Sequence, residues 1–234
     1  MDAATVGLAV STVIFALRPG ENGHVATLWI PLVRRITEPF NGQWALPGGF
    51  LRSDESLELA AGRNLFETTA LEPAYLEQLF AFGEVDRAPG GRVVSVVYWA
   101  LVRPDLADQA AVGENVQWFP ADDLPDLAFD HNSIVDYALW RLRSKMEYSR
   151  IAHALLGETF TLAELREVHE AVRGKPIDPA NFRRHVEHSE ALVATEERRT
   201  GTKHRPPRLY RYNTQFELAD NGPLTRRPSG AGKE

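Results

Sequence analysis

Two glutamates that follow a glycine pair are the residues of this sequence best suited to chemistry. A short predicted strand ends in Gly48 and Gly49, whose freedom of backbone angle allows a tight turn. Glu55 and Glu67 come after the turn. Carboxylates beside exposed backbone suit magnesium, which takes hard oxygen ligands and meets phosphates through them. The stretch is a candidate cradle for a magnesium diphosphate, and the alternative is an ordinary surface helix with its charges outward.

A helix is predicted after this turn from the spacing of its apolar residues. They lie mostly on one stripe of an amphipathic helix: Leu57, Ala60, Ala61, Leu65 and Leu71. The charged residues are left for the turn and the other faces: Glu55, Glu58, Arg63 and Glu67. The stretch from Trp44 to Leu71 is therefore predicted to form a strand, a glycine turn and a helix.

The same stretch resembles the Nudix box, whose pattern is G-x5-E-x7-R-E-U-x-E-E-x-G-U with U aliphatic. LPGG leads into it, and six positions match: Gly49, Glu55, Arg63, Leu65, Glu67 and Leu71. Three positions depart from it, because Asn64 and Thr68 replace glutamates and Ala70 replaces the glycine. The resemblance implies a Nudix fold with a pocket for a nucleoside diphosphate linked to another group.

The two missing glutamates weaken the predicted metal site. Nudix enzymes need the carboxylate cluster to position metals that activate the attacking water, and residues 64, 67 and 68 are neighbours around one helical turn. Glu67 and Glu55 remain as metal candidates, and Arg63 can pair with Glu67 four positions on. We therefore expect weak or absent magnesium binding, no required cofactor and an impaired enzyme, with residual ADP-ribose pyrophosphatase activity left open.

The pocket need not be lost with the catalysis. Arginine pairs with phosphate in a bidentate fork, and an aromatic ring can stack on adenine. The candidates for ligand contact are Arg35, Phe40, Trp44, Gly49, Arg92 and His131. Ordinary structural roles are the alternative: Trp44 as core, Arg92 as an edge-strand residue and His131 as a helix cap.

The elements around this stretch complete an α/β architecture. Strands are predicted over Val6–Leu17, His24–Arg34, Leu79–Val85, Arg92–Val102 and Val116–Phe119. The first two form a hairpin, and apolar residues at helical period predict a helix over His131–Ser149. The expected fold of this half is a mixed sheet sandwiched by helices.

The second half changes to two helices and a hairpin. A capping box opens the helix predicted over Thr161–Arg173, and Asp178 caps a second helix. Strands follow over Ala191–Arg199 and Pro207–Asn213. This order is that of an α+β winged helix-turn-helix, whose second helix enters the major groove of DNA.

Charge and composition support two modules. Residues 1–149 carry 11 Lys+Arg against 20 Asp+Glu, whereas residues 150–213 carry 12 against 9 and five histidines, which suits a polyanion. We expect a ligand-sensing domain over 1–149, a DNA-binding domain over 150–215 and a disordered tail over 216–234.

The composition also excludes some classes of protein. Without cysteine, disulfides and thiolate metal sites are excluded. The apolar run Val6–Leu17 is too short and polar to span a bilayer, so a cytoplasmic protein without membrane contact is expected.

Basic and polar side chains of the second half are candidates for contacting DNA. On the recognition helix, Arg can read guanine and Asn adenine, while hairpin cations meet phosphates. The candidates are Asn181, Arg183, Arg184, His188, Arg198, Arg199, Lys203, His204, Arg205 and Arg208. The alternatives are solvated surface charges or a protein partner.

Together the two halves resemble the Nudix-related transcriptional regulators of NAD metabolism, the NrtR family. The resemblance rests on the degenerate Nudix box, FTLAELREVHEAVRGKPIDPANFRRHV and RPPRLYRYN. It implies a homodimeric repressor of NAD biosynthesis or salvage genes that binds palindromic operators and responds to ADP-ribose or a related nucleotide. Two other functions stay open: an active Nudix hydrolase of ADP-ribose-like nucleoside diphosphates, and a protein-interaction module with a relict pocket.

Overall fold

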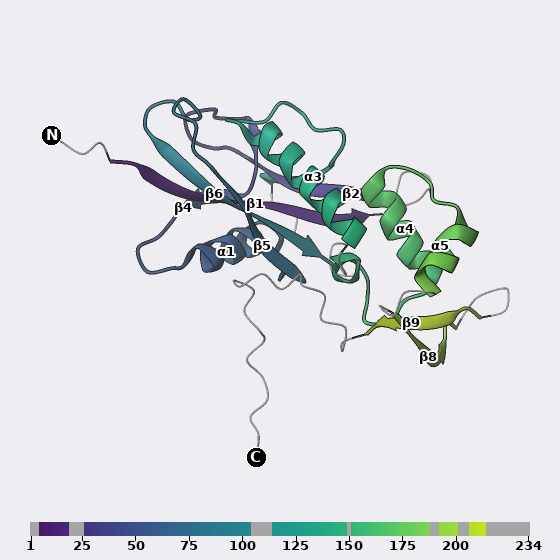
Figure 1. Ribbon diagram of the computed structural model, residues 1–234. Coiled ribbons are helices and arrows are strands. Elements are labelled where there is room, and N and C mark those ends of the chain that lie inside the picture. The colour runs from purple at the N-terminus through teal and green to yellow at the C-terminus, as the bar shows by residue number, and fades with distance from the viewer. Residues whose placement is uncertain are drawn as a thin grey trace, which may run out of the picture.

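The computed structural model describes residues 5–18, 26–103, 114–148, 151–187, 192–200 and 206–213. The tail predicted from residue 216 and the hairpin tip lie outside these residues. A mixed sheet with helices on both faces is followed by a smaller domain of helices and a β-hairpin at one end (Figure 1). Within the described part of the chain, no helix is long and apolar enough to cross a membrane.

Strand β1 (Gly7–Arg18) lies at the centre of the sheet. It pairs antiparallel with β2 (Thr27–Arg34), as the predicted hairpin requires, and antiparallel with the short β4 (Gly48–Phe50). On its other side it pairs parallel with β6 (Val93–Val102) along ten residue pairs. Most of β1 is buried on both faces, so the sheet is fixed from its centre outward.

The remaining strands extend the sheet to its two edges. Strand β5 (Tyr75–Phe82) pairs with β6 and forms one edge. Strands β3 (Trp44–Ala45) and β7 (Val116–Pro120) both pair with β2. The start predicted for β5 at Leu79 is wrong, because Tyr75 already pairs with Leu101 directly after the turn that ends the preceding helix.

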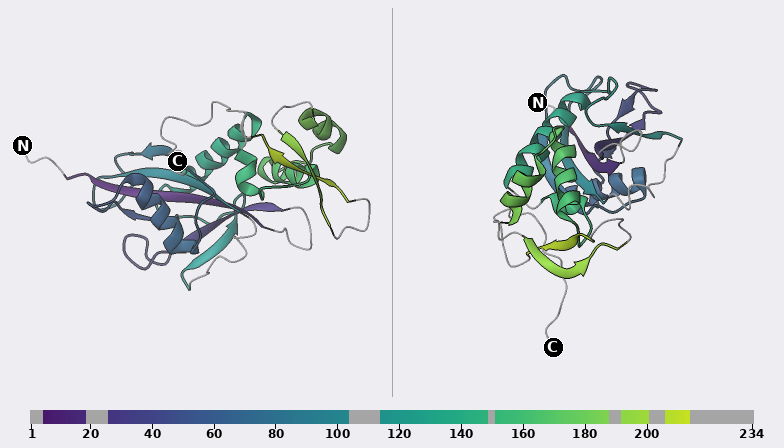
Figure 2. Two further views of the ribbon diagram at one scale, coloured as in Figure 1. Left: turned by 90° about the horizontal axis from the view of Figure 1, so that it is seen from below. Right: turned by 90° about the vertical axis from the view of Figure 1, so that its right-hand side faces the viewer.

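Helices cover opposite faces of the sheet, and the alternation along the strands shows which face is which. Val13 and Phe15 of β1 belong to the apolar cluster that includes α3 (His131–Tyr148). Ile14, between them, packs with Leu65 of α1 (Leu57–Thr69). The right-hand view of Figure 2 shows the strands between the two helices. The predicted α/β sandwich is confirmed.

The glycine pair does not form the predicted turn. Gly48 and Gly49 lie in β4, opposite Ser11 and Val10, and neither has a positive φ. A Cβ at position 48 would lie 2.8 Å from the Val10 carbonyl oxygen, whereas one at position 49 would meet nothing within 4 Å. Gly48 is therefore required for close approach to β1 rather than for an unusual backbone angle.

The second domain has the predicted order. Helices α4 (Leu162–Arg173) and α5 (Pro179–Glu187) are followed by the hairpin β8 (Leu192–Arg198) and β9 (Arg208–Tyr212). The capping box at Thr161 is present, and Asp178 accepts a hydrogen bond from the Asn181 N–H at 2.8 Å. Before α4, Phe160 exchanges two backbone hydrogen bonds with Tyr210 and so forms an isolated antiparallel bridge to the hairpin.

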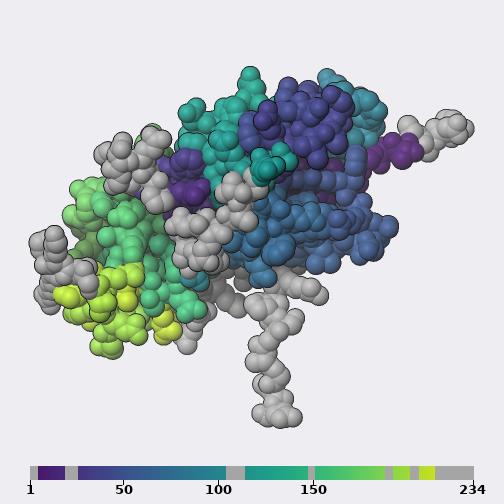
Figure 3. Space-filling view, turned by 180° about the vertical axis from the view of Figure 1, so that it is seen from behind, coloured from purple at the N-terminus to yellow at the C-terminus, as the bar shows by residue number. Residues whose placement is uncertain are grey.

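One hydrophobic core joins the two domains. The cluster that holds Phe15 and Trp99 of the sheet continues through Leu155, in the 3-10 helix η2 (Ile151–Leu155), to Leu165 and Val172 of α4. All of these side chains are buried. In Figure 3 the second domain, green to yellow, sits directly against the first. The winged helix is thus packed onto the sheet and not suspended from a linker.

The end of α1 gives a first prediction. Ala70 caps the helix in the left-handed conformation with φ 57°, where the Nudix pattern has glycine. This conformation costs about 1–2 kcal/mol for a residue with a side chain, and glycine removes that cost. Glycine also gives the unfolded chain more conformational freedom, which lowers stability by about 0.4–1 kcal/mol. Ala70→Gly should therefore raise the free energy of unfolding in urea by roughly 0.5–1 kcal/mol.

The control is Ala163→Gly, the same replacement at an exposed position in the first turn of α4. There the backbone is already helical, so glycine should lower the free energy of unfolding by up to about 1 kcal/mol. An unchanged or lower value for Ala70→Gly would contradict the role given to its backbone angle.

Candidate nucleotide pocket and nucleic-acid interface

Arg63 holds the carboxylates that remain from the Nudix box. Its Nε and Nη2 donate to the two oxygens of Glu55 at 2.9 and 2.7 Å, and its Nη1 donates to Glu67 at 3.3 Å. The predicted Arg63–Glu67 pair is thus present, but Glu55 is the closer partner. The hydrogen bonds from Arg63, and one from the Arg52 N–H, lower the pKa of Glu55 to about 2, so this carboxylate is ionised at neutral pH.

The two replaced positions of the box serve the fold instead. Asn64 is buried and donates from Nδ2 to the Val10 carbonyl of β1 at 3.0 Å. Thr68 is also buried and donates to the Asn64 carbonyl at 2.7 Å. Among the described residues, no three His, Asp or Glu side chains come together as metal ligands.

An aromatic cluster forms where three predicted ligand contacts meet. The Phe40 and Phe129 rings lie edge to face with centroids 4.9 Å apart, and the Arg35 guanidinium lies 4.8 Å from the Phe129 centroid. His131 approaches the same ring at 5.3 Å. We call Arg35, Phe40, Phe129 and His131 the aromatic cluster.

Two members of the aromatic cluster have strained backbones. Phe40 has φ 69° and Phe129 has φ 59°, a region that bulky residues rarely adopt. Such strain is characteristic of sites where side-chain placement matters. Sequence reasoning missed Phe129. The available signal was an aromatic residue in the acidic loop after β7, where the sequence shows no helical or strand periodicity that would place the ring in the core.

His131 has a structural role within the cluster. It is almost completely buried, and its Nδ1 accepts a hydrogen bond from the Leu46 N–H at 3.0 Å. Burial lowers the pKa of His131 to about 4, so the ring is neutral. The neighbouring Asp130 makes a bidentate ion pair with Arg87, at 2.9 and 2.6 Å. These bonds fix the start of α3 and with it the position of Phe129.

The other predicted ligand residues lie elsewhere or face the core. The Trp44 ring packs edge to face against Phe119 at 5.2 Å, although its carbonyl accepts from the Ala128 N–H. Gly49 lies in β4 opposite Val10, beside the Nudix box. Arg92 donates to the Glu84 carbonyl at 2.7 Å. Ligand contact by these residues stays a prediction.

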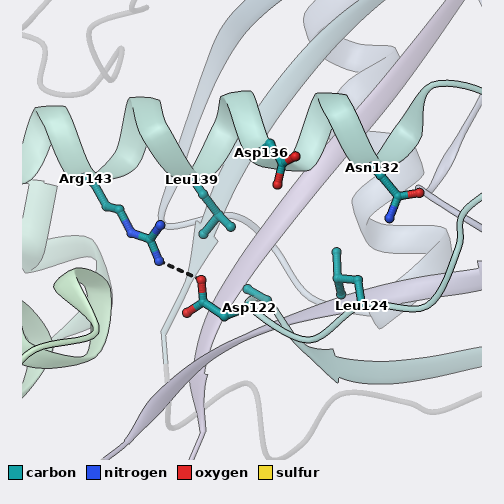
Figure 4. Close-up of a pocket in the computed structure, with 7 residues that line it drawn as sticks. Asp122, Leu124, Asn132, Asp136, Leu139 and Arg143 are labelled. Carbon is teal, nitrogen blue, oxygen red and sulfur yellow. Dashed lines mark hydrogen bonds and ion pairs between the residues drawn. The ribbon is translucent and has the colours of Figure 1, made fainter.

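Arg143 ties the loop after β7 to the winged helix. Its Nη2 donates to Asp122 at 2.7 Å, and its Nε donates to the Val172 carbonyl in the last turn of α4 at 3.0 Å. Figure 4 shows Arg143 reaching from α3 to Asp122 along a cavity of about 270 Å³. The same loop, residues 121–130, carries Phe129 at its far end. One loop therefore connects the aromatic cluster to the domain junction.

Three predicted DNA contacts converge in the second domain. Arg183 of α5, Arg198 of β8 and Arg208 of β9 line a groove of about 540 Å³ together with Thr161, Leu162 and Ala163 at the start of α4. The positive dipole of a helix N-terminus attracts anions, and in α4 the capping box already takes the Glu164 N–H. Arginines from three elements and a helix N-terminus are a suitable set of partners for a phosphate chain.

The remaining predicted DNA contacts are in varied settings. Asn181 and Arg184 are exposed on α5, none of whose residues is buried. Arg199 pairs with Glu164, the glutamate of the capping box of α4, and so also stabilises the domain. His188, Lys203, His204 and Arg205 lie outside the described residues.

Known proteins with this combination of domains were found by sequence and by structure. Residues 8–138 match the NUDIX domain, and residues 152–212 match the NrtR DNA-binding winged helix domain. The ADPR responsive transcriptional repressor NtrR of Acinetobacter baylyi is 33% identical over 213 residues, which cover 89% of this chain and 82% of that protein.

Two solved structures carry further information. The crystal structure of Shewanella oneidensis NrtR complexed with a 27mer DNA has a TM-score of 0.74 and 38% identity, over 88% of this chain and 93% of that one. The NUDIX domain of the same protein complexed with ADP ribose has a TM-score of 0.50 and 36% identity, over 60% and 90%.

Two histidines, the buried His131 and the half-buried His169, predict sensitivity to mild acid. His131 and His169 are held neutral in the fold, because burial lowers the pKa of each to about 4, whereas the unfolded chain protonates them near 6.5. The unfolded state therefore binds more protons, and stability falls as the pH drops through this window. Each histidine should lower the free energy of unfolding by about 1 kcal/mol per pH unit between roughly pH 6.5 and pH 4.

Urea unfolding across this pH range tests the prediction with His131→Gln, whose amide oxygen can still accept from the Leu46 N–H. This variant should lose about half of the two-histidine effect, since only His169 then titrates. A pH dependence identical to that of the parent would contradict the assignment of His131 as a buried neutral base.

Proposed function

The chain belongs to the NrtR family of Nudix-related transcriptional regulators, and we propose that it is a repressor of NAD biosynthesis or salvage genes that ADP-ribose, or a related nucleotide, releases from its operator. The observation that carries the proposal is the convergence of Arg183, Arg198 and Arg208 on the N-terminus of α4, in a chain whose other domain holds the aromatic cluster. The relative from Shewanella crystallised with DNA and, as its NUDIX domain, with ADP ribose supports both halves.

On the DNA side, the groove between α5 and the hairpin supplies the contacts. A duplex that follows this groove would place phosphates beside Arg198, Arg208 and the α4 N-terminus, while α5 lies toward the bases. Arg183 donates to Glu187 at 2.9 Å, and this exposed pair would have to open or turn for Arg183 to reach a base. Phosphate contacts give affinity, and Asn181, Arg183 and Arg184 give sequence preference.

On the effector side, the aromatic cluster supplies a place for a base and a phosphate. Phe129 has Phe40 at its edge and Arg35 over its ring, so a nucleotide base could stack where the two aromatics meet. Arg35 could turn from its backbone acceptor at Pro39 toward a diphosphate. Both phenylalanines already have fixed, strained backbone conformations in the absence of ligand. Ligand binding therefore costs little additional conformational entropy at these residues.

Catalysis is impaired in this proposal, and no cofactor is required. Asn64 and Thr68 are engaged in hydrogen bonds inside the fold, and Glu55 is paired with Arg63. A magnesium ion would then depend on Glu67, which is largely exposed and also shared with Arg63. Bound magnesium would neutralise diphosphate charge, but the carboxylates present fit it poorly. The effector can therefore persist as a signal instead of being consumed.

The loop over residues 121–130 is the proposed link between the two sites. A ligand shifts a conformational equilibrium only if it binds one state better than the other. Stacking on Phe129 would favour one placement of this loop, and Asp122 at its other end is bonded to Arg143, which holds the end of α4. Binding of ADP-ribose can in this way change the angle of the winged helix against the sheet.

Separating the two activities by mutation tests the function. Arg183→Ala should weaken operator binding about 5- to 150-fold, the effect of one lost base contact, while leaving ADP-ribose binding unchanged. Phe129→Ala should do the reverse, giving a protein that binds operator but ignores ADP-ribose. Operator affinity by fluorescence anisotropy and ADP-ribose binding by calorimetry give both readouts.

Arg52→Ala is the matched control, because Arg52 is similarly exposed but lies in the Nudix domain. It should leave operator affinity within a factor of about 2. The same samples with magnesium should release AMP well below ~1 per second, the low end of ordinary enzyme rates. Faster release of AMP, together with no operator binding, would show that the protein is a hydrolase and not a repressor.

The coupling has its own test in Arg143→Gln, which removes the ion pair to Asp122. Operator and ADP-ribose should each still bind alone, but the fall in operator affinity caused by ADP-ribose should shrink about 2- to 30-fold, the usual range for a residue that carries coupling. The control is Arg166→Gln, which removes the same charge inside α4, where Arg166 pairs with Glu170. A full ADP-ribose response in Arg143→Gln would refute the loop as the link.

A further inference from the structure

A carboxylate lies among the arginines of the proposed DNA groove. Glu187, the last residue of α5, lines this groove together with Arg183, Arg198 and Arg208. Its side chain is 39% exposed, and its Oε1 accepts a hydrogen bond from Arg183 Nε at 2.9 Å. A negative charge weakens the attraction of such a groove for phosphates, so a need for affinity alone does not account for Glu187.

The stability of α5 does not account for Glu187 either. The C-terminal end of a helix is the negative end of its dipole and favours cations, yet Glu187 occupies the last position of the helix. Its pair with Arg183 also has the less favourable order, because a glutamate placed four residues before its cation gives the better pair. Exposed pairs of this kind contribute little to folding. The fold therefore gains little from a carboxylate at this position.

The geometry of the pair leaves one end of Arg183 free for recognition. Glu187 engages Nε, and within the described part of the chain neither Nη1 nor Nη2 of Arg183 donates to another residue. The guanidinium is a planar fork, and its two Nη groups can donate together to O6 and N7 of guanine. Arg183 can thus read a base while its Nε stays bonded to Glu187.

The packing of α5 directs this pair toward the groove. Phe182 and Val186 pack against the shared core, and the Phe182 ring lies edge to face with His169 of α4 at 5.4 Å. Residues four apart lie one above the other on a helix, so Arg183 and Glu187 form the next stripe around α5. The hairpin lies next to α5 in Figure 1 and lines the same groove. The packed face of α5 therefore fixes the side from which the pair meets a duplex.

We infer that Glu187 is a specificity-determining residue of the DNA interface, which orients Arg183 for a guanine and reduces the attraction of Arg183 for phosphates. The inference rests on the proposed function, because it assumes that the groove binds duplex DNA. Glu187 acts on the correct complex through orientation and on incorrect complexes through charge. Both effects increase the preference for the operator.

The first effect is the orientation of Arg183 in the operator complex. A long side chain loses rotamer freedom when it is fixed against a base. The bond from Nε to Glu187 removes part of this freedom before DNA arrives, so less is lost when the Nη groups bind guanine. Arg183 and Glu187 can turn together toward the base without breaking their own bond.

The second effect is the neutralisation of Arg183 on unrelated DNA. Binding to unrelated sequence depends on how many phosphates the cations of the protein neutralise. Arg183 paired with Glu187 brings no net charge to such a contact, and the carboxylate repels a phosphate beside it. Arg198 differs, because it donates to the neutral Pro206 carbonyl at 3.0 Å and keeps its charge. The hairpin thus supplies affinity, whereas the pair on α5 supplies discrimination.

Selection of duplexes from a random pool by the full chain supplies the probe for the test. Fluorescence anisotropy then gives the affinities of the parent and Glu187→Gln for the selected duplex and for an unrelated one. Glu187→Gln should lower the ratio of these affinities about 5-fold or more, the low end for one bidentate arginine–guanine contact. It should bind the unrelated duplex more tightly, with a salt dependence steeper by about 0.9 because Arg183 gains a phosphate.

The control is Glu167→Gln, which makes the same change of charge at an exposed glutamate of α4. Glu167 is not among the described residues that line the groove. This variant should keep the affinity ratio and the salt dependence of the parent, and circular dichroism verifies the fold of each protein. If Glu187 were only structural, Glu187→Gln would weaken binding to both duplexes equally, and that result would overturn the inference.

A double variant tests whether Glu187 acts through Arg183. The affinity ratio of Arg183→Ala/Glu187→Gln should equal that of Arg183→Ala, because without the guanidinium the carboxylate affects both duplexes alike. A further fall in the ratio would overturn the inference. So would a preference for cytosine that Glu187→Gln loses and Arg183→Ala keeps, since the carboxylate would then read the cytosine amino group itself.

The selectivity of the parent separates this inference from the proposed function. If the parent prefers its selected duplex and Glu187→Gln keeps the same affinity ratio, only the role of Glu187 is refuted. If the parent selects no sequence from the pool, the proposed repressor is refuted, and the role of Glu187 with it.

Discussion

The hydrophobic core shared by the sheet and the winged helix is the constraint on which the rest of the molecule depends. Phe15 and Trp99 belong to the same buried cluster as Leu155 and Val172, so a change in the sheet reaches the DNA-binding domain without crossing a solvent gap. Close-packed interiors change between discrete packings and do not deform smoothly. An event at the aromatic cluster can therefore be transmitted as a change in packing, with Arg143 as the polar contact at the seam.

The helix that carries the Nudix box has a structural use at two of its positions. Asn64 secures α1 to the central strand, a bond to a main-chain carbonyl that a carboxylate could not donate. The Thr68 hydroxyl donates a hydrogen bond to the Asn64 carbonyl of the same helix. Both replacements lie in buried positions, where a pair of neighbouring glutamates without a metal would carry an uncompensated charge. The two positions that depart from the glutamates of the Nudix pattern thus both contribute hydrogen bonds to the fold.

Local patterns in the sequence predicted most of the fold. The helical stripe of α1, the capping box at Thr161 and the cap at Asp178 depend on residues within one turn of each other, and all three are present.

What the sequence could not predict depends on contacts between distant segments. Phe160 joins the hairpin only because Tyr210 lies beside it, and position 48 requires glycine only because a Cβ there would lie 2.8 Å from the Val10 carbonyl oxygen of β1. Phe129 became a site candidate through Phe40 and Arg35, which lie about ninety residues earlier in the chain. The assignment of individual ligand and DNA contacts stays a prediction.

The shared core also keeps the charge of the first domain beside the second. The first 149 residues carry nine more acidic than basic side chains, and the core packs their domain against the winged helix. Charges within about 8 Å are felt at physiological salt, so an acidic first domain would repel a duplex that does not seat correctly in the groove. Sliding along unrelated sequence, which depends on loose phosphate contact, is then brief, and such a protein would search a genome mainly by dissociating and landing again.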